Sequence, residues 1–263
     1  MYGYRSKLDQ KGFNMKMFVI IAALFAFDCY ATEGSKAIPS EAESVKASSI
    51  QSFLGENYVP RSSWGKVAVN YMTLEQEGNL SLDELKEIAS LHHTVTGSKY
   101  SSQGNINLDD EFKTVEEVEK LHIDTFKFAD VGYHYMIGQS GKVYEGRPLQ
   151  YTGSHTGGLN SKNAGIAFIG CYDDKGCPKE GYNVTDVTDE MIESAANLIA
   201  YLSVNQGLVI SPETIIPRSL YDVNKKGQTK FPYSPGNRII EVVEEIVKRS
   251  LSKLESVKAT PSV

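Results

Sequence analysis

Two adjacent histidines, His92 and His93, end a short apolar run in the stretch SLHHTVTG. Histidine is the commonest metal ligand in proteins, and a catalytic zinc site needs three protein ligands with one position left open for water. The chain has three further histidines, His122, His134 and His155, and none after them. The first question is therefore whether other donors complete a metal site.

The cysteines are the other residues that could do chemistry. Cys171 and Cys177 enclose five residues in CYDDKGC, a turn-like loop that lets their Cα atoms approach to the roughly 5.5 Å of a disulfide. We predict that they form a disulfide. The alternative is two metal-binding thiols, which is disfavoured because no histidine lies near them in the sequence.

The N-terminal segment has the pattern of an export signal. Lys16 precedes an apolar run over residues 17–27, which is followed by CYA, a small-x-small cleavage site. We predict that residues 1–31 are a signal peptide and that the mature protein is secreted or periplasmic. A retained anchor is the alternative, although the run has about half of the roughly 20 apolar residues that a spanning helix needs. Asp28 disfavours a lipid anchor on Cys29.

Composition excludes some partners. The 263 residues are 41% hydrophobic, enough for a buried core, and carry a net charge of -6. Such a charge does not suit the phosphates of nucleic acid or an anionic membrane surface. We expect no nucleic-acid partner, and no stable membrane insertion once the signal peptide is cleaved.

The elements that must position these residues alternate between strand and helix. Residues 32–57 are rich in Ser, Ala and Glu and predict a flexible leader, and residues 255–263 predict a disordered tail. Residues 58–254 between them predict one mixed α/β domain.

Three helices are predicted. The first begins at a capping box at Thr114, the second covers DEMIESAANLIAYLSVNQ and ends before Gly207, and the third follows the sequence SPG that ends at residue 236. Residues 133–137 and 142–146 predict a hairpin, and residues 164–170 predict a buried strand. A second capping box, at Ser81 and Glu84, favours a helix into Ile88, whereas the resemblance described next favours a strand there.

Four stretches together resemble the peptidoglycan recognition proteins and the type 2 N-acetylmuramoyl-L-alanine amidases. They are VPRSSWG, SLHHTVTG, LHIDTFKFADVGYHYMIGQSGKVYEGR and YTGSHTGGLNSKNAGIAFIGCYDD, and the resemblance covers most of residues 58–254. DVGYHYMI, GKVYEGR and GSHTGGLN in this order are more specific than any one motif. The resemblance implies a central mixed sheet of about five or six strands flanked by helices.

The resemblance also implies a zinc site in active members. A histidine of the first motif, a histidine of a later Gly-His-Arg-Asp-like stretch, and a Cys or Asp before Pro-Gly hold the ion. The zinc-bound water, with its pKa lowered from 15.7 to about 7, attacks the amide between muramic acid and L-Ala. A hairpin tyrosine stabilises the oxyanion.

Carried over to this chain, the zinc site is incomplete. His92 matches the first ligand and Tyr133 the assisting tyrosine. The second stretch reads IIPRSLYDV without a histidine, and Ser234 precedes Pro-Gly. One imidazole is not a zinc site. We therefore expect no zinc cofactor and interpret His92 as a remnant; the alternative is a rearranged site that recruits Asp222 or His155.

The predicted cleft contains His92, Tyr133, His155 and Arg147 as substrate-binding residues. Arg147 is expected to pair with a stem-peptide carboxylate or, equally, to form a structural salt bridge. His93, His122 and Trp64 are interpreted as core residues, and His134 is expected to face away from the cleft.

The leading hypothesis is an exported protein that binds peptidoglycan or muropeptides with a degraded zinc site and without catalysis. The first alternative is a zinc amidase with a rearranged ligand set, in which Tyr133 is catalytic. The second alternative is an interaction protein that keeps the fold but no longer binds the glycan. The unusual sequence Pro148-Leu149-Gln150 leaves this alternative open. The source, animal or bacterial, stays open.

Overall fold

The structure is a computed structural model, and it describes residues 49–67, 69, 73–74, 86–95, 108–221 and 231–259. The predicted signal peptide, most of the predicted leader, both residues of the second capping box and Asp222 lie outside the described residues. No described helix is long and apolar enough to cross a bilayer.

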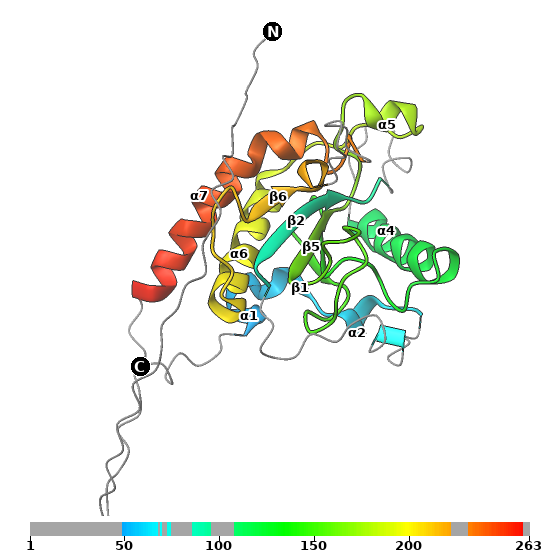
Figure 1. The fold of residues 1–263 in the computed structure, drawn as a ribbon. Helices are drawn as coiled ribbons and strands as arrows, with labels where there is room; N and C mark the ends of the chain where they lie inside the picture. The colour runs from blue at the N-terminus through cyan, green and yellow to red at the C-terminus, as the bar shows by residue number, and fades with distance from the viewer. Residues whose placement is uncertain are drawn as a thin grey trace, which may run out of the picture. The chain divides into compact units, whose positions relative to one another are not determined.

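Six strands form one mixed sheet in the order β1-β4-β3-β5-β2-β6 (Figure 1). Only the hairpin pair β3–β4 is antiparallel. The strands are β1 Tyr58–Val59, β2 Ile88–His93, β3 Tyr135–Ile137, β4 Val143–Glu145, β5 Asn163–Phe168 and β6 Ile215–Pro217. The predicted mixed α/β class with five or six strands is confirmed.

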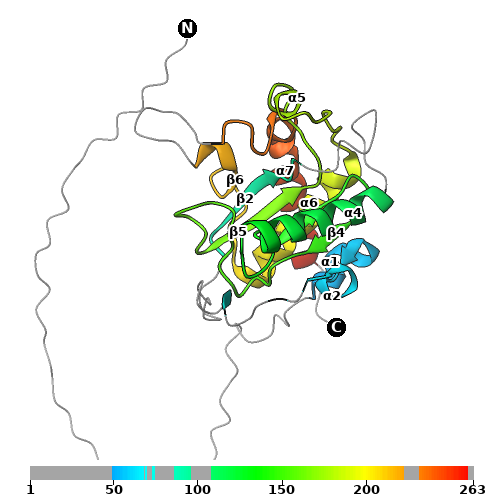
Figure 2. The same ribbon diagram turned by 90° about the vertical axis from the view of Figure 1, so that its right-hand side faces the viewer.

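Helices cover both faces of this sheet. Helices α6 (Asp189–Gln206) and α7 (Asn237–Ala259) pack on one face, and α4 (Leu108–Lys120) packs on the other (Figures 1 and 2). The shorter elements are α1 Ile50–Leu54, η2 Gly55–Asn57, α2 Arg61–Trp64, η4 Leu121–Thr125, α5 Gly176–Lys179 and η5 Arg218–Leu220.

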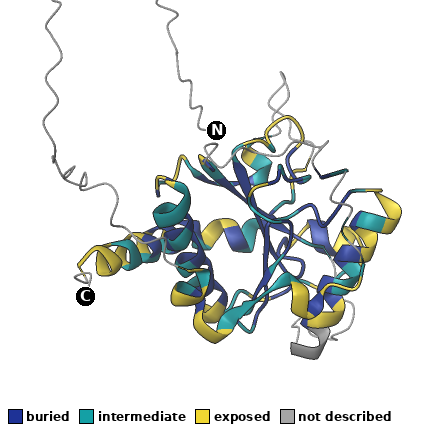
Figure 3. Ribbon diagram, turned by 90° about the horizontal axis from the view of Figure 1, so that it is seen from below, coloured by how far each residue is buried: buried dark blue, intermediate teal, exposed yellow. Residues whose placement is uncertain are grey.

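Strand alternation divides the interior into two cores. In β2, Ala89 and Leu91 join the core beneath α6 and α7, so Ser90 and His92 point to the opposite face. On that face Val115 and Val118 of α4 pack with Met136 and other buried residues. The central strands are accordingly dark blue, between helices whose outer surfaces are yellow (Figure 3).

Several predicted elements are confirmed. Helix α6 is capped by the Thr188 side chain and ends at Gly207, which adopts the left-handed conformation at φ 68°. The hairpin forms as β3–β4, and the buried strand forms as β5. Ile88 begins a strand, so the local conflict there is resolved in favour of β2. Cys171 and Cys177 form the predicted disulfide, with Cα atoms 5.7 Å apart.

Three predicted boundaries are wrong. Helix α4 begins at Leu108, and Thr114 lies fully buried within it and not at its N-terminus. The leader does not extend to residue 57, because Ile50–Leu54 form α1 and Leu54 is buried in the core. The tail does not begin at residue 255, because α7 continues to Ala259.

Candidate functional site

Strand β2 supplies the floor of the candidate site. Ser90 and His92 lie two residues apart on one face of this strand, and both are fully buried. The Oγ atom of Ser90 lies 2.9 Å from Nε2 of His92 and 3.2 Å from Nδ1 of His155. A hydroxyl therefore connects the two imidazoles.

The loop after β4 brings His155 and Thr156 over this floor. The Asn160 side chain holds the loop, because its Oδ1 accepts the backbone N–H groups of His155 (3.0 Å) and Thr156 (2.6 Å). The Oγ1 atom of Thr156 lies 3.0 Å from Nδ1 of His155 and 3.5 Å from Nε2 of His92. Two hydroxyls and two imidazole nitrogens thus form one hydrogen-bonded cluster, which we call the histidine–hydroxyl cluster (Ser90, His92, His155, Thr156).

Glycine at position 165 makes room for His155. A Cβ atom on Gly165 would lie 2.5 Å from Cδ2 of His155, closer than real Cβ contacts allow. We expect Gly165→Ala to displace the His155 ring and lower the free energy of unfolding by about 1–3 kcal/mol. Gly157→Ala is the control: Gly157 lies in the loop that carries His155, and an added Cβ there would have no atom within 4 Å. Chemical denaturation of both variants measures the difference, and equal stabilities would contradict this packing.

Tyr133 stands beside the cluster. Its ring centroid is 5.2 Å from that of His92 and 6.4 Å from that of His155, and the residue is half-buried. His122 packs against its other side at 5.3 Å, and Nδ1 of His122 accepts the Gly132 N–H. The prediction that His122 is a packed residue is confirmed.

His134 does not face away as predicted. Its ring lies 5.6 Å from the His155 ring, and its nitrogens contact the backbone of Gly165 and Tyr151. Both Tyr133 and His134 precede β3, which begins at Tyr135, so strict strand alternation does not place them on opposite faces.

Burial keeps the histidines of the site neutral. It lowers the pKa of His155 to about 3, with the nearby Arg218 guanidinium acting in the same direction. Burial, followed by the effects of His155 and Arg218, also lowers the pKa of His92 well below its usual range. Burial raises the pKa of Tyr133. Neutral imidazoles and an un-ionised phenol are therefore the groups that the site presents.

Arg218 brings a positive charge to the cluster. The parallel register pairs Leu91 with Pro217, and Arg218 directly follows Pro217 as the first residue of η5. One Nη1 atom donates to the carbonyl oxygen of His155, and Cζ lies 3.7 Å from the centroid of the Phe231 ring. The guanidinium is thus held between a loop carbonyl and an aromatic ring.

These residues do not fit a zinc ion. Nε2 of His92 and Nδ1 of His155 contact the hydroxyls of Ser90 and Thr156, which are poor zinc ligands when neutral. Nδ1 of His92 and Nε2 of His155 are buried without a hydrogen-bond partner, but the described residues bring no third nitrogen, thiolate or carboxylate donor to them. The Arg218 charge that disfavours a proton on these imidazoles also disfavours a divalent cation. Among the residues that the structure describes, only His93, Cys171 and Cys177 have three ligand atoms close enough to share a metal, and the two sulfurs form the disulfide.

Arg147 does not join the predicted cleft residues. It is fully buried, and its guanidinium donates to the backbone carbonyls of Val131, Thr152 and Asp130. These bonds fix the loops on either side of the hairpin, so the contacts of Arg147 are structural. A carboxylate of a ligand cannot reach this side chain in the folded arrangement.

The two other predicted core residues are confirmed. His93 is 6% exposed and its Nδ1 accepts the Tyr172 N–H, while Trp64 is 1% exposed and donates to the Glu145 carbonyl.

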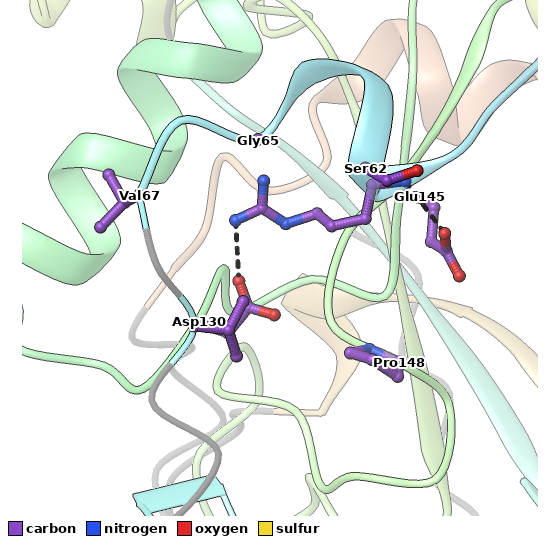
Figure 4. Close-up of a pocket in the computed structure, with 8 residues that line it drawn as sticks. Ser62, Gly65, Val67, Asp130, Glu145 and Pro148 are labelled. Carbon is purple, nitrogen blue, oxygen red and sulfur yellow. Dashed lines mark hydrogen bonds and ion pairs between the residues drawn. The ribbon is translucent and has the colours of Figure 1, made fainter.

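A hollow of about 400 Å³ lies beside helix α2 (Figure 4). Its lining residues are Arg61, Ser62, Gly65, Val67, Val69, Asp130, Glu145 and Pro148. Arg61 pairs there with Asp130 at 3.1 Å and also with Glu119, and its guanidinium lies over the Trp64 ring. The charged groups of this hollow are engaged in tying α2 to the domain, and none of the predicted site residues lines it.

The sequence did not single out Ser90, Thr156 and Arg218 as site residues. The hydroxyls carry no signal of their own, because serine and threonine are common in loops and strands. Arg218 does carry one. It directly follows the short apolar run of β6, where the chain leaves the sheet beside the histidine strand.

Comparison with known proteins shows which family the chain is similar to. The sequence profile of the N-acetylmuramoyl-L-alanine amidase family matches residues 87–233. Peptidoglycan-recognition protein SC2 of Drosophila melanogaster is 29% identical over 182 residues, which cover 69% of this chain and 83% of that protein.

Solved structures show the same fold. Bumblebee PGRP-SA is 26% identical with a TM-score of 0.52, over 71% of this chain and 93% of that one. Peptidoglycan recognition protein LE in complex with tracheal cytotoxin is 24% identical with a TM-score of 0.53, over 72% of this chain and 93% of that one. With the profile match over more than half of its length, this chain belongs to the peptidoglycan recognition protein and type 2 N-acetylmuramoyl-L-alanine amidase family.

Proposed function

We propose that this protein binds peptidoglycan or its muropeptide fragments and does not hydrolyse them. The observation that carries the proposal is that only two imidazoles come together here, with one ring nitrogen of each already in contact with the hydroxyls of Ser90 and Thr156. A hydrolase of this family would need three donors around one open position there. We further propose that zinc is not its cofactor.

Binding of a muropeptide is supported by relatives. Peptidoglycan recognition protein LE has been solved with tracheal cytotoxin, a monomeric diaminopimelic acid-type peptidoglycan, and it shares the fold of this chain. The predicted export signal is consistent with a ligand that lies outside the cytoplasm. We therefore propose a secreted or periplasmic protein whose partner is the cell wall.

Tyr133 is the predicted residue best placed to contact the ligand. His92 and His155 are 0% and 4% exposed, whereas Tyr133 is half-buried and borders them. A phenol at a cleft wall combines a hydrogen-bonding hydroxyl with a ring that packs on a sugar or peptide. In this proposal the rings of His92 and His155 pack beside the Tyr133 ring and hold it in position.

Co-sedimentation with insoluble purified peptidoglycan tests the proposal. We expect the wild-type protein to sediment with the wall, and Tyr133→Phe to bind about 3- to 10-fold more weakly, the cost of one hydrogen bond. Tyr201→Phe removes a hydroxyl from α6, on the other face of the sheet, and is the matched control.

Two results would count against the proposal. Failure of the wild-type protein to sediment would favour the interaction protein that has lost the glycan. Sedimentation with release of stem peptides would favour the amidase with rearranged ligands.

A further inference from the structure

The loop between α5 and α6 contains an acceptor sequence for N-linked glycosylation. Asn183-Val184-Thr185 has the pattern Asn-x-Thr, in which the middle residue is not proline. Asn183 is exposed and belongs to an irregular segment, so a glycan on its side chain would extend into solvent. A second sequence of this kind, Asn79-Leu80-Ser81, lies outside the described residues. Asn183 is therefore the acceptor that the structure describes.

The threonine of this sequence is closed off in the folded protein. Thr185 is 0% exposed, and its Oγ1 accepts the Cys171 N–H at 3.0 Å. The backbone N–H of Thr185 donates to the Cys171 carbonyl at 2.7 Å. A Cβ atom on Gly170 would lie 2.7 Å from the same Oγ1, so the hydroxyl packs directly against the backbone there. An enzyme that recognises this hydroxyl cannot reach it once the loop has folded.

The disulfide ties both ends of the acceptor sequence. Cys171 and Cys177 are bonded to each other, with Cα atoms 5.7 Å apart. Thr185 is hydrogen-bonded to Cys171, and the Tyr182 N–H donates to the Cys177 carbonyl at 2.9 Å. Asn183 thus lies between a residue held by one cysteine and a residue held by the other. Formation of the disulfide therefore fixes the segment that a glycosylating enzyme must bind.

The predicted route of the chain supplies the enzyme. The apolar run before Asp28 predicts export, and a disulfide forms in an oxidising compartment. The relatives described above include proteins of a fruit fly and a bumblebee. In animal cells an exported chain meets the glycosylating enzyme as it enters the secretory pathway, before it has folded. The order of these events allows modification of Asn183 while Thr185 is still accessible.

We propose that Asn183 is an N-glycosylation site and that it is modified before the Cys171–Cys177 disulfide closes. The donor is an oligosaccharide linked to a lipid through pyrophosphate. The amide nitrogen of Asn183 forms a bond to the first sugar carbon and loses a proton, while the bond from that carbon to the pyrophosphate oxygen breaks and the lipid pyrophosphate leaves. This inference goes beyond the proposed function and does not depend on it.

Secretion of the full chain from cultured insect cells tests the site. The secreted protein is treated with a peptide:N-glycosidase in water enriched in heavy oxygen, which converts a glycosylated asparagine into labelled aspartate. We expect mass spectrometry to find the label at Asn183, and Asn183→Gln to lose it. Asn205→Gln on α6, where the sequence Asn-Gln-Gly is not an acceptor, is the control and should keep the label at Asn183. An unlabelled Asn183 in wild-type protein, whether secreted or retained in the cell, would overturn the site.

Transfer in vitro tests the order of events. The full chain is produced in bacteria without a glycan and is then supplied to microsomal transferase and lipid-linked oligosaccharide in two forms. We expect the reduced and alkylated chain to be glycosylated at Asn183, and the folded chain with its closed disulfide to lose this acceptor activity. Equal transfer to the two forms would overturn the proposed order, and transfer to neither form would overturn the acceptor site itself.

This inference and the proposed function fail separately. Sedimentation with peptidoglycan measures binding, whereas the label at Asn183 measures modification. If the protein sediments with the wall but Asn183 is unmodified, the glycosylation site is wrong and the proposed function stands. If Asn183 is modified and the protein does not sediment, the proposed function is wrong and the glycosylation site stands.

Discussion

Lowering the pH from 7 to 5 is expected to reduce the free energy of unfolding by about 2 kcal/mol for each of His93, His122 and His155, and so to destabilise the protein strongly by pH 5. All five histidines of the chain are buried. Burial lowers the pKa of His93 and of His122 to about 4 and that of His155 to about 3. The pKa values of His92 and His134 are also lowered, chiefly by burial.

The direction follows from which state binds protons. In the unfolded chain each histidine takes up a proton as the pH falls through about 6.5, whereas the folded protein leaves it neutral down to pH 3 or 4. Each such histidine therefore contributes its full stability above pH 6.5 and loses it progressively below. Together these three cost about 6 kcal/mol by pH 5, a large part of the stability of a typical domain, and the lowered pKa values of His92 and His134 act in the same direction.

Denaturant titrations at a series of pH values measure this effect. The slope of the unfolding free energy is expected to approach about 1.4 kcal/mol per pH unit for each histidine. His122→Asn keeps an oxygen that can accept the Gly132 N–H and should lower the proton uptake by about one, whereas Gly157→Ala, which changes no titratable group, should not. A stability that is constant between pH 7 and 5 would show that the folded protein carries charged histidines.

The double variant Arg218→His with Ser234→Cys is expected to bind about one zinc ion per chain, whereas the wild-type protein binds none. Arg218 follows Pro217, which pairs with Leu91 next to His92, and the Ser219 N–H donates to the Ser234 carbonyl at 2.8 Å. The two substitutions therefore introduce an imidazole and a thiolate beside the existing imidazole and remove the opposing charge. Imidazole nitrogen and cysteine thiolate are both ligands that zinc prefers, and three of them leave the fourth position open.

Elemental analysis after dialysis and thermal unfolding with and without added zinc provide two readouts. Zinc at 100 times its dissociation constant should stabilise the variant by about 2.7 kcal/mol and leave the wild type unchanged. Arg218→Gln with Ser234→Ala removes the same side chains without adding donors and is the control. Zinc binding by the wild type would contradict the proposal that the site has lost its metal, and a double variant without zinc would contradict the placement of Arg218 and Ser234.

The parts of the fold that local patterns specify could be predicted. The apolar stripe of α6 and the glycine at its end, Gly207, give both the helix and its terminus. Long-range packing decides the parts that could not. The Phe53 ring packs on Tyr201 of α6 at 5.8 Å, so a segment with a leader-like composition becomes helix α1.

The same division holds for the site. His92, Tyr133 and His155 were predicted from motifs and do come together. The hydroxyls and the charge beside these residues depend on how the strands and loops pack against one another. A sequence motif does not specify that packing, so Ser90, Thr156 and Arg218 could not be predicted as neighbours. Arg147 shows the converse, because its place in a motif suggested ligand binding while its three carbonyl contacts make it a structural residue.

The most direct test of the central claim is one reaction in which wild-type protein and purified peptidoglycan are incubated with zinc in excess. The fraction of protein bound to the wall and the peptides released into solution are measured from the same sample, the latter by mass spectrometry. We predict that the protein binds and that no stem peptide with a free L-alanine amino group appears. Continuing release of such peptides would show that the protein is an amidase.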